Sequence, residues 1–557
     1  MNTIIREMMV NIRDFSRQKV LNQRNLFFFN RFLALYLPEH INLVVLRALS
    51  ALVVKIFGAT IFFNTKARRT PSTTKHVSHF EKHKIVVLIG WPLVFFYIYN
   101  PKQNQPAMRH SRRQFLSQSA AVAAGAGLAT LFPFPAFASR RFMLNDTIHY
   151  GVIGCKGMGW SNLRALLNNV PEATCIALAD VDQSVLDERA ADVEKLRGKK
   201  PKLFKDYRKM LEMKELDAVI IGTPDHWHCL MFCDALSAGK HVYCEKPLAN
   251  SIEECNVMMA AAKRHGKMVQ IGQWQRSGSH YQQAHEFLKT GQLGNIRLVK
   301  CWAYQGWMKS VPPKPDGAPP AGVDYDMWLG PAPKRPFNPN RFHFTFRWFW
   351  DYAGGLMTDW GVHEIDIALF FMGATAPKSV MASGGKLAYP DDASETPDTL
   401  QAVFEYDGFN MLWEHALGID NGPYGRTEGI AFIGNQGTLV VNRQGWEVIP
   451  ETQRNNKGVV EYKIADLPDQ RKDAQVDYLA EHHKNFVNAM QANDASLLKC
   501  GIETGAVAAI NAHMGNVAFK TGRKVYWDAA GGQFKNDAAA NELIKAHYQN
   551  GWVLPGL

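Results

Sequence analysis

Asp359 and His363 stand four positions apart in the segment GGLMTDWGVHEID, a spacing that combines an acid with a base. On a helix, residues four apart share one face, so the carboxylate could orient the imidazole or a bound substrate. A histidine that is neutral near pH 7 is suited to proton transfer. The alternative is a structural histidine behind a capped helix start, and the segment alone leaves both interpretations open.

A glycine-rich turn connects the first predicted strand of the main body, 150–154, to a helix-like stretch at 161–168. The next predicted strand ends at Asp180. This order is typical of a site that holds a dinucleotide pyrophosphate on a helix N-terminus. A carboxylate at Asp180 can bond both ribose hydroxyls and would repel a 2′-phosphate, which favours NAD over NADP. The expected contacts are Gly154, Lys156, Gly157, Met158, Gly159 and Asp180.

Lys156 stands where the pattern G-x-G-x-x-G has its second glycine. Its ammonium group could add a positive charge near the phosphates, or the exchange could mark a degenerate site. A site with no remaining activity would support a non-catalytic sugar-binding protein, so this departure keeps that function class open.

Strands and helices continue to alternate after this unit, with strands predicted at 216–222, 241–244 and 268–271. Repeated units of this length predict a doubly wound parallel sheet, whose ligands gather at the carboxyl ends of the strands. Those ends carry Thr223, Pro224, His228, Glu245 and Lys246, which we expect at the cofactor. His228 could equally be a helix-start residue. No His, Asp or Glu group completes a zinc ligand set, so no metal is expected.

The motifs GVIGCKGMG, GTPDHWH, CEKP and GGLMTDWGVHEID follow one another at spacings that resemble the glucose–fructose oxidoreductase / inositol dehydrogenase / MocA (Gfo/Idh/MocA) family. The resemblance covers residues 148–520. It implies an α/β fold: an N-terminal Rossmann domain with a doubly wound parallel sheet (139–271) and a C-terminal α/β domain with a large open, mostly antiparallel sheet (272–557). Alternating patterns independently predict strands in the second domain at 296–308, 379–388, 399–406, 409–417, 429–433 and 437–442.

The same resemblance assigns chemistry to particular residues. Lys246 would bond the reacting hydroxyl and stabilise developing alkoxide charge, although a lysine in a turn can simply be solvated. His363 would be the general base and Asp359 its catalytic partner. Gln273 and Arg276 would face the substrate. Trp348 and Tyr352 belong to the aromatic segment 341–352, whose rings could stack on sugar faces or fill the core.

The 557-residue chain has a net charge of +12, but that charge is concentrated at its start. Residues 1–138 hold 18 basic and 4 acidic side chains, whereas the remaining 419 residues hold 45 and 47. A net of −2 gives the main body no charge-based reason to bind nucleic acid. None of the eight cysteines shows a disulfide-like spacing.

Residues 108–138 resemble a twin-arginine export signal, with Arg112-Arg113, an Ala/Gly-rich apolar run and a final Ala136-Phe137-Ala138. Because such signals begin chains, we predict that translation starts at Met108 and that 1–107 is a spurious or poorly ordered extension. The apolar run at 85–99 is short for a membrane span, although a membrane-tethered form is the alternative. The predicted location is the periplasm, with the twin-arginine export machinery as a partner.

These observations predict an exported oxidoreductase that transfers a hydride from a sugar, glycoside or cyclitol hydroxyl to NAD. Free NAD is expected to be scarce outside the cytoplasm, so the cofactor would be loaded before export and held tightly. A redox-neutral enzyme that cleaves glycosides through transient oxidation is the main alternative. Relatives commonly associate through the open sheet, so a homo-oligomer is possible by resemblance.

Overall fold

The computed structural model describes residues 84–90, 93–99, 147–464, 467 and 477–556. The chain divides into two compact units, Met1–Phe132 and Pro133–Leu557, and each is described by itself. In the first unit, β1 (Lys84–Gly90) and β2 (Leu93–Tyr99) pair as an antiparallel hairpin within the apolar run. The export signal and the start at Met108 lie outside the described residues and stay predictions. Among the described helices, none has the length and hydropathy of a membrane span.

The second unit begins with a six-stranded parallel sheet whose order is β5-β4-β3-β6-β7-β8. Its strands are short and apolar, and the four residues of β6 are all buried, as expected of a sheet covered on both faces. The strand order reverses direction beside β3, where doubly wound sheets bind ligands. The elements are β3 (Ile148–Ile153), α5 (Gly157–Asn169), β4 (Ala173–Ala179), α6 (Gln183–Arg197), β5 (Lys202–Phe204), α7 (Tyr207–Leu211), β6 (Ala218–Ile221), α8 (His228–Ser237), β7 (His241–Cys244), α9 (Ile252–His265) and β8 (Val269–Ile271).

Local sequence explains where these helices begin and end. The Asp182 carboxylate accepts the Ser184 N–H at the start of α6, and the helix ends at Gly198 in the left-handed conformation. Ser251 caps α9 in the same way, and that helix ends at Gly266. Polar N-caps followed by left-handed glycines are typical helix boundaries.

A nine-stranded sheet forms the second domain, in the order β15-β14-β13-β9-β12-β11-β10-β18-β19. Only the pair β9 and β12 is parallel, so the predicted fold class is confirmed. The strands are β9 (Leu298–Gln305), β10 (Ser379–Gly385), β11 (Thr399–Glu405), β12 (Asn410–Leu417), β13 (Glu428–Ile433), β14 (Gly437–Asn442), β15 (Gly445–Pro450), β18 (Val525–Asp528) and β19 (Gln533–Phe534). A separate hairpin pairs β16 (Thr452–Arg454) with β17 (Val460–Tyr462).

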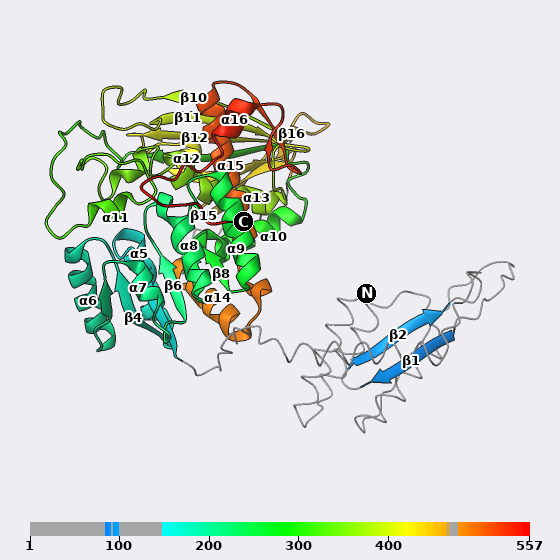
Figure 1. The fold of residues 1–557 in the computed structure, drawn as a ribbon. Coiled ribbons are helices and arrows are strands. Elements are labelled where there is room, and N and C mark those ends of the chain that lie inside the picture. The colour runs from blue at the N-terminus through cyan, green and yellow to red at the C-terminus, as the bar shows by residue number, and fades with distance from the viewer. Residues whose placement is uncertain (1–83, 91–92, 100–146, 465–466, 468–476, 557) are drawn as a thin grey trace. The chain divides into compact units, whose positions relative to one another are not determined.

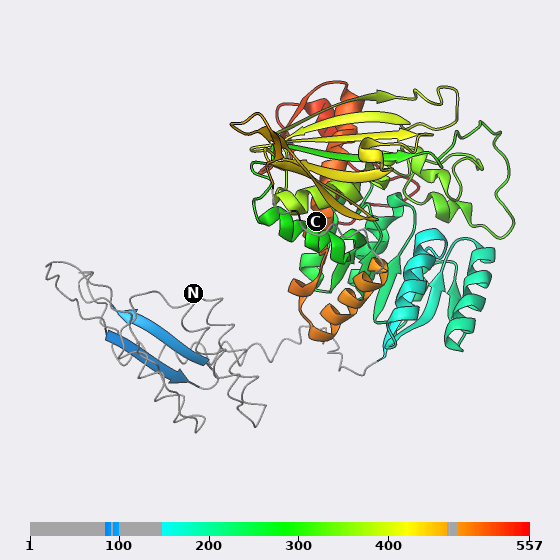
Figure 2. The ribbon, with the colours of Figure 1, turned by 180° about the vertical axis from the view of Figure 1, so that it is seen from behind.

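Helices cover the face of this sheet that is turned toward the Rossmann domain (Figures 1 and 2). The buried core joins side chains of the helices to Trp413, Phe404 and Phe432 of the sheet. The helices are α10 (Ser279–Lys289), α12 (Leu356–Asp359), α13 (Gly361–Met372) and α15 (Ile502–Thr521). The second domain also contains α11 (Tyr325–Leu329) and α16 (Ala538–Glu542). Because α12 and α13 belong to this layer, Asp359 and His363 lie at the junction of the domains.

The chain beyond residue 271 also completes the Rossmann domain. Helix α14 (Tyr478–Ala492) buries Phe486, Val487 and Met490 in the same cluster as strands β3 and β4. The ring of His483 stacks on Tyr243 of β7 at 4.4 Å between centroids. The predicted domain boundary at 271 stays a prediction. In space, helix α14 from the later part of the chain packs against the Rossmann sheet.

Residues 306–350, here called the strap, run from the second domain across the carboxyl ends of the Rossmann strands. Val323 pairs with Asp182 as an isolated antiparallel bridge, and the Asp324 N–H donates to the Val181 carbonyl at 2.9 Å. The Lys205 ammonium donates to the Gly322 carbonyl at 2.6 Å. The strap is therefore bonded directly to the segment that follows β4.

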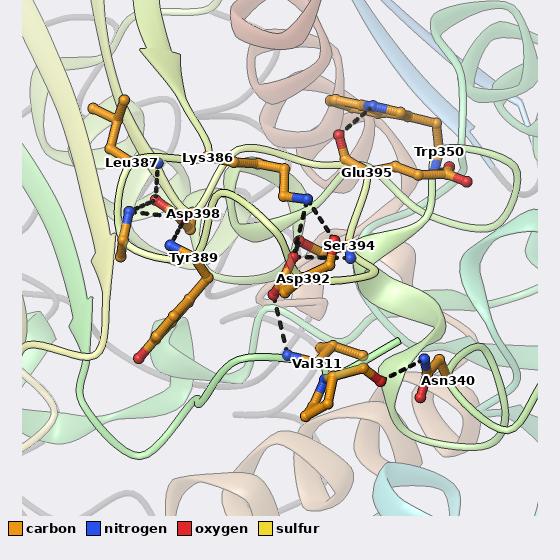
Figure 3. Close-up of polar contacts among 12 residues, drawn as sticks. Val311, Asn340, Trp350, Lys386, Leu387, Tyr389, Asp392, Ser394, Glu395 and Asp398 are labelled. Atoms are coloured by element: carbon orange, nitrogen blue, oxygen red, sulfur yellow. Dashed lines mark hydrogen bonds and ion pairs between the residues drawn. The ribbon is translucent and has the colours of Figure 1, made fainter. Parts of the chain in front are cut away.

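A loop between β10 and β11 anchors the strap in its own domain (Figure 3). The Asp392 carboxylate accepts the Val311 N–H at 3.1 Å and lies 3.2 Å from the Lys386 ammonium. The Glu395 carboxylate accepts the Trp350 N–H at 3.1 Å. Carboxylates that bond backbone N–H groups hold both ends of the strap in place.

Candidate active site

A cavity of about 320 Å³ lies between the Rossmann strand ends and the strap. Nine sequence-predicted cofactor residues line it: Gly154, Lys156, Gly157, Met158, Asp180, Thr223, Pro224, Glu245 and Lys246. The second domain contributes Met327, Trp328, His343, Phe344, Phe346, Arg347 and Asp359. The cavity thus has one wall from each domain, which is a common arrangement for cofactor sites.

Glycines shape the phosphate end of this cavity. Gly154 has φ +80°, a conformation that L side chains rarely adopt. Gly159 does not line the cavity, but a Cβ there would lie 1.8 Å from the Gly154 carbonyl oxygen. Only glycine therefore lets the start of α5 approach the turn. Lys156 directly precedes α5, where its charge adds to a helix N-terminus suited to phosphate.

Asp180 directly follows β4 and lines the cavity. Its carboxylate accepts the Cys155 N–H at 2.7 Å and the Asp182 N–H at 3.0 Å. Burial raises the pKa of this carboxyl above its usual value, although both hydrogen bonds oppose the shift. The Asp180 carboxylate supplies hydrogen-bond acceptors and the Lys156 ammonium supplies donors. Together with the glycine turn, these groups fit NAD.

Lys246 and Asp359 form an ion pair across the domain junction. The Lys246 Nζ donates to the Asp359 carboxylate at 3.0 Å and to its backbone carbonyl at 2.8 Å. The Arg347 Nε lies 3.8 Å from the other carboxylate oxygen. Burial alone would raise the pKa of Asp359, but the charges of Arg347 and Lys246 lower it to about 2. This carboxylate is therefore ionised at any physiological pH.

His363 lies in the first turn of α13 and is 4% exposed. Helix α12 ends at Asp359, so the predicted single helical face is two short helices joined at Trp360. Burial, together with the charges of Lys246 and Arg443, holds the pKa of His363 well below its usual value. The imidazole is consequently neutral and able to accept a proton. Its Nδ1 is buried without a hydrogen-bond partner among the described residues.

His228 does not line the cavity, but it connects two loops that do. Its Nδ1 lies 2.8 Å from the Pro247 carbonyl and its Nε2 lies 3.0 Å from the Thr223 carbonyl. Burial lowers the pKa of the ring, although both carbonyl contacts oppose the shift. His228 thereby fixes the segment that carries Lys246.

A second network holds the same segment from the opposite side. The Asn162 amide donates to the Glu245 carboxylate at 2.7 Å, and the His483 Nε2 donates to the Asn162 oxygen at 2.9 Å. All three side chains are at most 3% exposed. Sequence reasoning missed Asn162 and His483, because 321 positions separate them and no motif connects them.

The four predicted substrate contacts do not line the cavity. Arg276 makes a paired contact with Asp366 at 2.7 and 2.9 Å, which accounts for its charge. Trp348 is a buried member of the second-domain core. Tyr352 is fully buried against the rings of His226 and Trp328, and Gln273 is fully buried and accepts from the Cys500 thiol. Their roles in substrate binding stay predictions.

Arg347, in the same aromatic segment as Trp348 and Tyr352, lines the cavity, whereas those two residues do not. The rings of Trp274 and Trp360 lie 5.4 and 6.2 Å from the His363 ring. In the described part of the chain, no three His, Cys, Asp or Glu side chains gather as a metal site would require.

Comparisons with known families match both halves of the second unit. Residues 148–273 match the NAD-binding Rossmann fold of the Gfo/Idh/MocA oxidoreductase family, and residues 301–424 match the C-terminal alpha/beta domain of that family. The glycine turn, Asp180 and Lys246 lie in the first match, and Asp359 and His363 lie in the second.

Curated relatives span most of the same region. The rhizopine catabolism protein MocA of Rhizobium meliloti is 28% identical over 263 residues, which are 47% of this chain and 69% of MocA. The scyllo-inositol 2-dehydrogenase (NAD(+)) of Bacillus subtilis is 25% identical over 323 residues, 56% of this chain and 82% of the relative. An oxidoreductase of the same organism, YrbE, is 26% identical over 292 residues, 52% of this chain and 73% of YrbE.

Solved structures share the fold at lower identity. The scyllo-inositol dehydrogenase of Lactobacillus casei with bound NAD(H) and scyllo-inositol superposes with a TM-score of 0.50 at 22% identity, covering 68% of this chain and 99% of the other. GenD2 from gentamicin A biosynthesis, in complex with NAD, gives 0.51 at 18% identity, covering 71% and 100%.

Proposed function

We propose that this chain oxidises a hydroxyl of a sugar, glycoside or cyclitol while NAD stays bound, and that it belongs to the Gfo/Idh/MocA oxidoreductase family, whose two domain models match residues 148–273 and 301–424. The observation that carries this proposal is the ion pair of Lys246 with Asp359, which lines the NAD cavity beside the neutral His363. Relatives named for scyllo-inositol and inositol oxidation support the substrate class.

Each residue has a distinct part in the reaction. The Lys246 ammonium donates a hydrogen bond to the substrate hydroxyl oxygen and stabilises negative charge that develops there. The His363 imidazole accepts the hydroxyl proton as the carbon–hydrogen bond breaks. NAD supplies the acceptor for the hydride, so the alcohol carbon becomes a carbonyl. Asp359 keeps Lys246 charged and oriented through its hydrogen bond of 3.0 Å.

Two variants test these parts separately from folding. We expect Lys246→Met and His363→Asn each to lower turnover by about 10²–10⁴-fold, since general acid–base groups contribute on that scale. NAD content, measured after denaturation, should stay close to one per chain in the His363 variant, because that residue does not line the cofactor cavity. Full turnover in both variants would refute the assignment.

The strap supports the retention of NAD. It covers the cavity with His343 and Phe344, and the His343 ring bonds the Asp182 carboxylate at 2.9 Å. The cofactor would have to pass this cover to exchange. We expect the purified chain to contain NAD, and His343→Ala to release it faster during dialysis than a control variant, Arg454→Met, on the exposed hairpin. Protein that purifies free of NAD would contradict retention.

A captive cofactor favours a cycle that restores it in place. A second sugar could be reduced in turn, or a glycoside could be oxidised, cleaved and reduced again within one turnover. Mixing the protein with aryl glycosides and no added NAD distinguishes these routes. Release of the aryl alcohol without net NADH identifies the redox-neutral route, whereas NADH that disappears on adding a ketose identifies the two-substrate route.

Export to the periplasm through the twin-arginine route is part of the same proposal. Its support is the motif around Arg112-Arg113 and the Ala136-Phe137-Ala138 end. N-terminal sequencing of the mature protein should begin at or shortly after Ser139. A mature protein that begins well before Ser139 would remove this part, and light scattering of the mature protein would test self-association.

A further inference from the structure

Next to His363, a guanidinium group is held between two indole rings. Arg443 lies in the turn between β14 and β15, and its guanidinium carbon is 4.5 Å from the Trp274 ring centre and 4.2 Å from that of Trp360. Both indoles also contact the His363 ring edge to face. We call Trp274, Arg443 and Trp360 the Trp–Arg–Trp cluster. It comes from three segments that are distant in sequence, so no sequence motif reveals it.

The Arg443 guanidinium has no carboxylate bonded to it among the described residues, although its charge acts on the nearby Asp359 carboxylate. Among those residues, its one side-chain hydrogen bond goes to Gln275 at 3.2 Å. Glu364 is close enough to interact electrostatically, but burial raises its pKa to about 8, so it is mainly protonated at neutral pH. Glu428 accepts the backbone N–H of Arg443 instead.

Two other cationic side chains at the site already interact with a carboxylate. Lys246 and Arg347 both line the NAD cavity, at 3.0 and 3.8 Å from the Asp359 carboxylate. Arg443 does not line that cavity, although its charge lowers the pKa values of both His363 and Asp359. It therefore lies beside the reacting groups and apart from the residues expected at the cofactor phosphates.

Buried polar atoms around the cluster have no partner among the described residues. They include the Trp274 Nε1, the Arg443 Nε and the His363 Nδ1. Buried polar groups are nearly always hydrogen-bonded in folded proteins, and leaving them unpaired is costly. Their concentration at one place points to a ligand with several oxygen atoms.

The two indole contacts bear on the kind of group that binds. With two indole rings within 4.5 Å of the guanidinium carbon, a ligand is expected to meet the guanidinium along the edge of its plane, where its N–H groups point. A carboxylate meets that edge with two parallel hydrogen bonds, a match that a single hydroxyl does not provide. A neutral ligand would leave the partly desolvated charge uncompensated.

Resting on the proposed function, we propose that the Trp–Arg–Trp cluster binds a carboxylate of the substrate, so that the substrate is an acidic sugar of the hexuronate class. The carboxylate would lie on Arg443 while a ring hydroxyl reaches Lys246 and His363. This arrangement makes Arg443 the residue that distinguishes an acidic sugar from the corresponding neutral one.

Calorimetric titration of the NAD-loaded full chain tests this assignment. The ligands are D-glucuronate and D-galacturonate, each paired with its neutral hexose, D-glucose or D-galactose. We expect at least one hexuronate to bind about tenfold or more tightly than its hexose, which corresponds to about 1.4 kcal/mol. Arg443→Met should weaken hexuronate binding much more than hexose binding and so remove this preference, and Arg443→Lys should restore part of it. Arg454→Met, on the exposed hairpin, should behave as the unchanged chain.

Three results would overturn the assignment: equal affinity for hexuronate and hexose, equal loss of both in Arg443→Met, or no binding of either hexuronate. If Arg443→Met does not fold, the comparison of ligands on the unchanged chain still decides. NADH fluorescence separates this inference from the proposed function. A hexuronate that binds through Arg443 without reducing NAD refutes the oxidation, whereas a hexose that reduces NAD without hexuronate binding refutes only the acidic substrate.

Discussion

Two buried ion pairs lie near the domain junction: Lys246–Asp359 connects the two domains, whereas Arg276–Asp366 lies within the second domain. Lys246 with Asp359 has side chains 12% and 16% exposed, and Arg276 with Asp366 has side chains 13% and 2% exposed. Both acids lie on the adjoining helices α12 and α13, only seven positions apart. Burial and charge are therefore nearly matched, while only the first pair lines the NAD cavity.

The difference lies in which hydrogen bonds each pair can offer to a ligand. The Arg276 guanidinium makes both of its short contacts to one carboxylate and stacks over the Phe370 ring, so it is satisfied internally. Lys246 uses two of its three donors on Asp359 and keeps one for the cavity. An ion pair becomes part of a site when one of its donors remains available.

The largest expected effect is the loss of turnover in Lys246→Met. Removing the hydrogen bond to the reacting oxygen should lower kcat per folded molecule by about 10²–10⁴-fold, and the melting temperature should also fall because the buried Asp359 carboxylate loses a partner. The matched variant is Arg276→Met, which should keep kcat per folded molecule near its original value. Similar losses of kcat in both variants would abolish the distinction between the pairs.

The second prediction concerns stability, where we expect the larger loss at the Arg276–Asp366 pair. Arg276→Met leaves Asp366 as a nearly fully buried, unpaired carboxylate, which should lower the free energy of unfolding by about 3–5 kcal/mol. The double variant Arg276→Met/Asp366→Leu should recover much of this loss, because no buried charge remains. Urea unfolding measures both. A double variant as unstable as the single one would contradict the explanation.

Sequence alone predicted much of the fold and part of the site. The strands predicted at 399–406 and 437–442 are β11 and β14 almost to the residue, because alternation and turn residues are local signals. Gly154, Asp180 and Lys246 were found because each follows a strand end in a recognisable motif.

Residues that depend on long-range packing could not be predicted in this way. Trp348 and Tyr352 have the composition of a sugar platform and of a core alike, and only the fold places them in the interior. Arg443 stands 80 positions after His363, and the pairing of β14 with β15 brings it to that ring. No local pattern marks a residue whose partners come from other segments.

The third prediction concerns the protonation of Asp359 at low pH, which removes its ion pair with Lys246. The pKa of this carboxyl is lowered to about 2 from the ordinary 3.8, so its ionised form stabilises the fold above that ordinary value. This contribution, about 2 kcal/mol, should disappear as the pH falls from 4 toward 2. The stability difference between the unchanged chain and Asp359→Asn, followed by urea unfolding, should therefore be full at pH 6 and shrink below pH 4. A difference independent of pH would contradict the ion pair.

The smallest effect is expected at an exposed pair of the same chemical type. Lys545 lies 2.7 Å from Glu542, which is three residues earlier at the end of α16, but both side chains are more than half exposed. Water and salt screen such a pair, and holding two long side chains together costs entropy that offsets the attraction. Lys545→Met should therefore change neither kcat nor the urea midpoint beyond measurement error. A clear loss of stability in this variant would show that an exposed ion pair also stabilises the fold, so burial would not explain the large effect expected for Arg276→Met.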